Sequence, residues 1–160
     1  MPLEEINKVF GNKLRVRVSG ICIKDDAILL IEHKSIGESG ILWAPPGGGM
    51  NFGENAHNTL IREFEEETGL TISVGKLLWV NEYLENPLHA IELFFEVNIV
   101  SGKLALGNDP ELDSQKQILS KIEFIPIKNL NHFAKGTLHG NLVNIESVED
   151  LYALSGYLRS

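Results

Sequence analysis

Residues 48–70 read GGMNFGENAHNTLIREFEEETGL and join a glycine-rich loop to a helix-forming segment. Residues 47–53 contain four of the chain's 15 glycines and predict a loop. Residues 54–68 predict a helix, and Gly69 is a residue of the type that ends one. This order places loop backbone, which glycine leaves open to close approach, directly before the first turn of a helix.

The predicted helix has an apolar side and an acidic side. At about 100° per residue, Leu60, Ile61 and Phe64 share one arc, which predicts a face that packs on a core. The neighbouring arc consists of Glu63, Glu66 and Glu67. These carboxylates repel one another, and the helix dipole disfavours them near the C-terminal end. A divalent cation would offset both effects, and Mg²⁺ prefers oxygen ligands. For a helix considered alone, a solvated acidic face is the alternative.

Two other kinds of phosphate-binding loop are excluded. Gly48 and Gly53 have the spacing of a Walker A loop, but Glu54 stands where its lysine should be. A dinucleotide-binding loop that starts at Gly47 would need a third glycine where Phe52 stands.

Two further charged residues belong with the acidic arc. Glu54 stands at the predicted helix start, where the helix dipole favours a carboxylate. Arg62 lies between the acidic arc and the solvent side, where it could orient Glu63 or Glu54 through a charge-assisted hydrogen bond.

Together these residues resemble the Nudix box, G-x5-E-x7-R-E-U-x-E-E-x-G-U, in which U is apolar. Every defined position is filled between Gly48 and Leu70. The strand order from about residue 15 to the C-terminal helix also looks like a Nudix domain. Predicted strands and helices mix without regular alternation, which favours an α+β or mixed α/β fold. The resemblance implies a Nudix-type α/β/α sandwich around a mixed β-sheet, with the box as a loop–helix–loop.

The resemblance also implies roles for single residues. The implied ligands of Mg²⁺ or Mn²⁺ are Glu63, Glu66 and Glu67. A backbone carbonyl of Gly47 or Gly48 is expected to join them. Arg62 would orient the carboxylates, and Glu54 would support them.

The implied reaction is the attack of water on a phosphorus of a nucleoside diphosphate linked to another group, X. Glu63 is one candidate for the general base, and Glu111 in a polar loop is the other. Two alternatives stay open, a house-cleaning pyrophosphatase that acts on nucleoside triphosphates and a nucleotide-sensing module that has lost catalysis.

The rest of the chain predicts strands and one more helix. Residues 14–23 and 27–32 form a predicted hairpin around an Asp-Asp turn. Further strands are predicted at residues 41–44, 72–84, 89–100 and 122–127. Residues 101–120 predict a long mobile loop. Residues 147–158 predict an amphipathic helix with Ser147 as N-cap and Leu151, Leu154 and Leu158 on one face.

Candidate substrate-binding residues lie on two of these strands. Arg15 and Arg17 alternate along the first, so they share a face that could meet a phosphate or a terminal group. Trp79 and Tyr83 share a face of a later strand and could stack on a nucleobase, with core packing as the alternative. The five histidines have no tight metal-ligand spacing and are predicted to be structural or surface residues. His89 is the one candidate for a functional role.

Bulk properties limit the class of protein. The length of 160 residues suits a single domain over 1–160, and the 43% hydrophobic content is that of a globular protein. We expect a cytoplasmic protein without a membrane span, and one cysteine is consistent with that compartment. The net charge of −8 argues against a nucleic-acid duplex as partner and favours a small nucleotide-type substrate bound with metal. A homodimer is possible, since dimers are common in the family that the chain resembles.

Overall fold

The computed structural model describes residues 2–37, 39–108, 110, 112–114 and 117–160. The helices in this part of the chain are α1 (Pro2–Phe10), α2 (Ala56–Thr68), α3 (Val148–Ala153) and the 3₁₀ helices η2 (Ile127–His132) and η3 (Gly140–Leu142). The strands are β1 (Lys13–Lys24), β2 (Ala27–Lys34), β3 (Ile41–Ala44), β4 (Gly47–Gly49), β5 (Leu70–Glu85), β6 (Leu88–Gly102), β7 (Leu119–Pro126) and β8 (Tyr157–Arg159).

The strands form one mixed sheet in the order β3-β2-β1-β6-β5-β8, with β4 paired to β1 and β7 paired to β2. β1 runs parallel to β6, whereas β1 and β2 are antiparallel, as are β5 and β6. The prediction of a mixed α/β fold with a mixed sheet is confirmed.

The predicted hairpin forms, and it determines where the sheet opens. Asp25 and Asp26 have φ angles of 51° and 56°, as a two-residue turn with both central residues left-handed requires. β1 and β2 pair at Ile23↔Ile28 and Lys24↔Ala27. Beyond these pairs β1 bonds to β4 and β6, and β2 bonds to β3 and β7. The two halves of the sheet therefore separate away from the turn, which leaves room between them.

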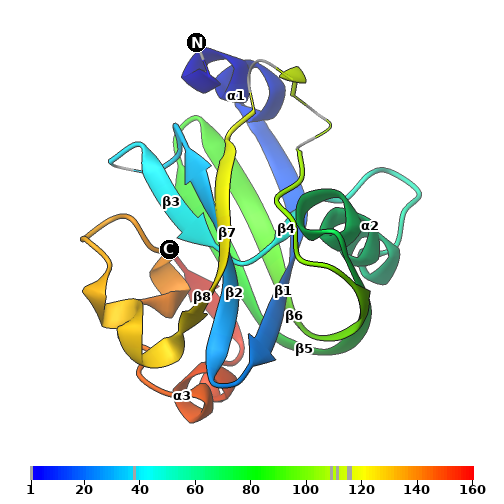
Figure 1. The fold of residues 1–160 in the computed structure, drawn as a ribbon. Coiled ribbons are helices and arrows are strands. Elements are labelled where there is room, and N and C mark those ends of the chain that lie inside the picture. Colours follow the sequence, from blue (N-terminus) through cyan, green and yellow to red (C-terminus); the bar gives the residue numbers. More distant parts are fainter. Residues whose placement is uncertain (1, 38, 109, 111, 115–116) are drawn as a thin grey trace.

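The hydrophobic core lies on both faces of the sheet, because side chains alternate along each strand. On one face, Leu60 and Phe64 of α2 pack against Val18 and Cys22 of β1. On the other face, a second cluster joins Ile21 to residues of η2, η3 and α3. Figure 1 shows α2 on one side of the sheet, α3 on the other and α1 beyond one end. The described residues contain no helix that is both long and apolar enough to cross a membrane.

The C-terminal prediction was correct at its start and wrong at its end. Ser147 caps α3 by accepting a hydrogen bond from the backbone N–H of Asp150. The helix ends at Ala153, and Gly156 has a φ of 73° that turns the chain into β8. β8 pairs in parallel with β5, so Leu158 lies on a strand. Strand pairing has overridden the helical spacing of the leucines.

Other elements also differ from the predictions, since residues 47–49 form strand β4 where a loop was predicted. α2 begins at Ala56 behind the N-cap Asn55, so Glu54 precedes the helix instead of starting it. α1 was not predicted, yet Ile6 and Phe10 are buried in a cluster with β2 and β7. These two side chains are four positions apart, which places them on one face of a helix.

Candidate active site

A cavity lies where the two halves of the sheet separate. Its walls come from β1, β2, β3, β5, β6 and β7, and α1 covers one side. β4 and α2 form an acidic end, to which Gly47, Gly48, Glu63 and Glu67 contribute. Glu92 and His139 line another part of the same cavity. The predicted loop–helix segment therefore contributes to the wall of this cavity.

Close packing of β4 against α2 explains the glycines of the loop. The backbone N–H of Gly47 donates to Oε2 of Glu67 over 3.2 Å. A Cβ atom on Gly48 would lie 2.3–2.6 Å from the carboxyl atoms of Glu63. Any side chain at residue 48 would therefore displace Glu63 from its place beside the loop.

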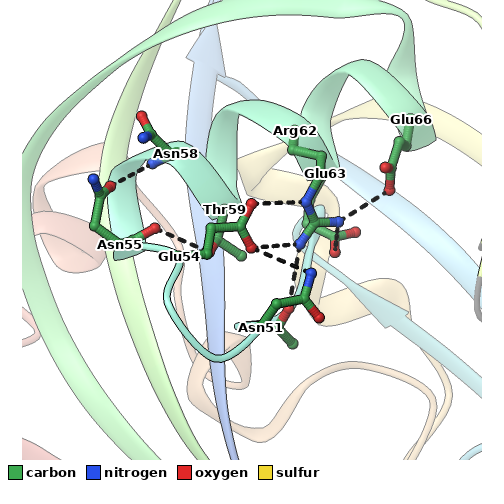
Figure 2. Close-up of polar contacts among 9 residues, drawn as sticks. Asn51, Glu54, Asn55, Asn58, Thr59, Arg62, Glu63 and Glu66 are labelled. Carbon is green, nitrogen blue, oxygen red and sulfur yellow. Dashed lines mark hydrogen bonds and ion pairs between the residues drawn. The ribbon is translucent and has the colours of Figure 1, made fainter.

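Arg62 links the carboxylates around it, as Figure 2 shows. Its Nε and Nη2 donate to the two carboxylate oxygens of Glu54, each over 2.9 Å. Its Nη1 donates to Glu63 over 2.8 Å and to Glu66 over 3.3 Å. The hydrogen bonds from Arg62 hold the pKa of Glu54 at about 2. Arg62 thus contacts both residues that the sequence proposed for it, although Glu54 lies outside the helix.

Glu63 combines burial with a position at the cavity wall. Burial raises the pKa of Glu63 to about 7, and Arg62 opposes the shift. The neighbouring Glu66 raises the pKa further. A bound cation would offset the cost of ionising this buried carboxylate.

The donors at the acidic end suit a hard divalent cation, because all of them are carboxylate or carbonyl oxygens. Glu63 and Glu67 face the cavity, and Gly48 leaves room for Glu63 to lie against the loop. Glu66 is bonded to Arg62 and does not line the cavity. Over the described residues, no three His, Cys, Asp or Glu side chains are already gathered as an ion-binding group.

Three of the four predicted substrate-binding residues line the cavity, namely Arg15, Arg17 and Tyr83. Trp79 does not. Its side chain is 1% exposed, stacks on Phe94 at 4.7 Å between ring centroids and donates to Asn141 over 2.9 Å. Trp79 is a core residue, which was the alternative to base stacking.

The predicted general base Glu111 lies outside the described residues. Among the histidines, His33, His89 and His139 line the cavity. Burial, with the charge of Arg17, lowers the pKa of His33 to about 4, so its ring is neutral at pH 7.

Sequence analysis missed Glu92 and His139 as cavity residues. Glu92 interrupts the apolar run of residues 90–95, and this interruption could have indicated a functional carboxylate from the sequence. A charged residue on an inward face of a strand is rare without a partner or a function. His139 gave no local signal, because a pairing of segments distant in the chain brings it to Glu92.

Comparison with known proteins identifies the family. A family model described as NUDIX domain matches residues 13–142. The chain belongs to the Nudix family.

The Nudix match spans β1 to η3, so it contains the acidic end of the cavity and Glu92 but excludes α1, α3 and β8. The chain is 34% identical over 121 residues to an ADP-ribose pyrophosphatase of Methanocaldococcus jannaschii, over 74% of this chain and 66% of that protein. It therefore spans slightly less than two thirds of that relative.

Solved structures share the Nudix fold at lower sequence identity. A NUDIX hydrolase from Nitrosomonas europaea has a TM-score of 0.67 at 23% identity and covers 88% of this chain and 90% of its own. A MutT NUDIX hydrolase from Burkholderia pseudomallei has a TM-score of 0.63 at 24% identity. The match covers 85% of this chain and 98% of that protein.

Proposed function

We propose that this Nudix protein hydrolyses a nucleoside diphosphate linked to another group, X. One observation carries the proposal: Glu63 and Glu67 open into the same cavity as Arg15 and Arg17. Carboxylates that suit a divalent cation and arginines that suit phosphate therefore face one space. Similarity to the ADP-ribose pyrophosphatase supports a substrate of this class.

Glu63, Glu66 and Glu67 would hold Mg²⁺ or Mn²⁺, with a carbonyl of Gly47 or Gly48. Bound there, the cation would neutralise the pyrophosphate and lower the pKa of a water molecule. Arg62 fixes Glu63 and Glu66 from the solvent side and is itself anchored by Glu54.

The chain's own side chains account for the remaining tasks. Arg15 and Arg17 would bind phosphate oxygens. A carboxylate, Glu63 or Glu111, would accept the proton of the attacking water. The oxygen of that water forms the new bond to phosphorus as the bridging P–O bond breaks, which yields a nucleoside monophosphate and a phosphorylated X.

A substrate panel tests the proposal. Purified protein with Mg²⁺ is incubated with ADP-ribose, nucleotide sugars, dinucleoside polyphosphates and nucleoside triphosphates, and products are separated by chromatography. We expect turnover of a diphosphate-X compound, its loss in Glu67→Gln and its retention in Glu65→Gln, since Glu65 is exposed on the same helix. Turnover of triphosphates alone, or of no compound, contradicts the proposal.

A further inference from the structure

Glu92 forms a second charged position in the cavity, separate from the acidic end. It lies on β6 directly beside Arg17 of β1 in the parallel register, and only 7% of its surface is exposed. Oε1 of Glu92 accepts hydrogen bonds from Nδ2 of Asn81 and Nε2 of His139, each over 2.9 Å. Within the described part of the chain, Oε2 receives no hydrogen bond, although Glu92 lines the cavity.

A chain of buried hydrogen bonds holds this carboxylate in place. Nδ1 of His139 accepts from the backbone N–H of Asn141 over 3.2 Å. With Nδ1 as an acceptor, the ring donates to Glu92 through the proton on Nε2. Nδ2 of Asn141 donates to Oδ1 of Asn81, and Trp79 donates to Oδ1 of Asn141, each over 2.9 Å. The network fixes Asn81 and His139, which in turn fix the direction of Glu92.

Glu92 is ionised despite its burial. Burial alone would raise its pKa, but His139, the charge of Arg17 and the hydrogen bond from Asn81 outweigh that effect and hold the pKa at about 2. An ionised carboxylate only accepts hydrogen bonds, and it repels phosphate. The phosphates of a substrate therefore belong at the opposite end, where a cation at Glu63 and Glu67 would meet them.

Arg17 lies between the two ends of the cavity. Its register partners are Gly49 on β4 and Glu92 on β6, so the acidic end and Glu92 lie on opposite sides of it. With a strand spacing of about 4.8 Å, Gly49 and Glu92 are roughly 10 Å apart across the sheet. The Nε atom of Arg17 is buried and has no hydrogen-bond partner among the described residues. Arg17 thus has donor capacity left for a ligand that passes from one end to the other.

The lining of the cavity includes an apolar part, to which α1 contributes from outside the Nudix match. The apolar side chains on it include Ile6, Phe10, Leu42, Leu88 and Ile118. Such a surface suits an uncharged, planar group better than a phosphate. A nucleoside is therefore the part of a nucleotide that suits a cavity lined by these side chains and by Glu92.

We propose that Glu92 is a specificity-determining residue that accepts a hydrogen bond from an uncharged N–H or O–H group of the substrate's nucleoside. Asn81 and His139 are positioning residues for its carboxylate. The proposal rests on the proposed function only for the placement of the phosphates at the acidic end.

Binding of AMP with Mg²⁺, measured by calorimetry, tests the proposal on the whole protein. AMP is compared with purine riboside 5′-monophosphate, which lacks the amino group, and with 2′-deoxy-AMP and 3′-deoxy-AMP, which each lack one hydroxyl. We expect about 10- to 100-fold weaker binding of one analogue, because a donor to an ionised acceptor is lost. Loss of the amino group points to the base, and loss of a hydroxyl points to the ribose.

Glu92→Gln is expected to abolish this discrimination. The glutamine oxygen replaces Oε1 toward Asn81 and His139, and its amide then presents a donor to the cavity. Glu96→Gln is the matched control, since Glu96 lies on the same face of β6 and does not line the cavity. The control should keep the wild-type preference.

Several outcomes overturn the proposal: no binding of AMP, equal affinity for AMP and all three analogues, or the same preference in Glu92→Gln. If Glu92→Gln does not fold, equal affinity of the wild-type protein for AMP and all three analogues still overturns the proposal. Discrimination without hydrolysis of any panel substrate refutes the proposed function alone. Hydrolysis without discrimination refutes the role of Glu92 alone.

Discussion

Gly48 lies directly against Glu63 of the acidic helix, and it gives the first prediction. In Gly48→Ala the new Cβ would meet the carboxyl group of Glu63 at 2.3–2.6 Å, so Glu63 must move. We expect turnover to fall about 100-fold, because a displacement of about 1 Å in a catalytic group has an effect of that order. Circular dichroism should show an intact fold. Wild-type turnover in this variant would contradict the close approach.

Glu63 predicts a pH dependence of stability in the metal-free protein. Its pKa in the fold is about 7, above the ordinary 4.5, so the folded state holds the proton more tightly than the unfolded state. Its contribution to the free energy of unfolding is therefore greatest below pH 4.5 and is lost as pH rises to about 7. Between pH 4.5 and pH 7, the free energy of unfolding that Glu63 contributes falls by at most about 3 kcal/mol.

Denaturant unfolding in EDTA at pH 4.5 and pH 7.5 measures this effect. Glu63→Gln cannot titrate, so we expect it to gain stability relative to wild type as pH rises. Glu65→Gln, an exposed position on the same helix, should follow the wild-type curve. Equal pH dependence in Glu63→Gln and wild type would show that Glu63 has an ordinary pKa.

The choice of general base leads to a separate prediction. If Glu111 accepts the proton of the attacking water, Glu111→Gln should lower kcat by about 100-fold or more with little change in KM. The measurement is steady-state kinetics on the best substrate of the panel. A kcat near wild type would assign the proton to Glu63.

At the scale of elements, the N-cap of α2 positions the acidic helix. Oδ1 of Asn55 accepts from the backbone N–H of Asn58 over 2.8 Å. Asn55→Ala removes this bond and should lower the free energy of unfolding by about 1 kcal/mol. Asn58→Ala keeps the N–H and should have a far smaller effect. Urea denaturation compares the two variants, and equal losses would rule out a specific capping role.

Local patterns predicted the elements whose structure is fixed locally. The Asp25-Asp26 turn, the helix that ends at Gly69 and the cap at Ser147 each depend on residues within a few positions. The tail was mispredicted because Leu158 follows the pairing of β8 with β5, which no local pattern specifies. Long-range pairing was therefore the main source of error.

The candidate site also has one part that local sequence predicts and one part that depends on long-range pairing. Its acidic end comes from one continuous segment, so the sequence predicted Arg62, Glu63, Glu66 and Glu67 as a group, of which Glu63 and Glu67 line the cavity. Glu92 and His139 meet only after β6 joins the sheet and the chain returns from η2 to η3. Side-chain direction on a strand depends on register, and register is set by distant partners.

For the whole molecule, the separation of the sheet halves and the charge of the chain act together. The cavity exists because β1 and β2 diverge after their turn, and it places Glu63 and Glu67 inside an already acidic protein of net charge −8. The folded state therefore brings carboxylates together that the unfolded chain keeps apart. Cations that bind these carboxylates should favour folding.

Thermal unfolding with increasing Mg²⁺ tests this prediction. A ligand that binds only the folded state adds about 2.7 kcal/mol when its concentration is 100 times Kd, so Tm should rise with Mg²⁺ and fall again with EDTA. Glu67→Gln and Glu65→Gln each remove one negative charge from α2, so general screening changes equally in both. Only Glu67→Gln should flatten the dependence of Tm on Mg²⁺. An equal rise of Tm in both variants would mean that Mg²⁺ screens the surface without occupying the acidic end of the cavity.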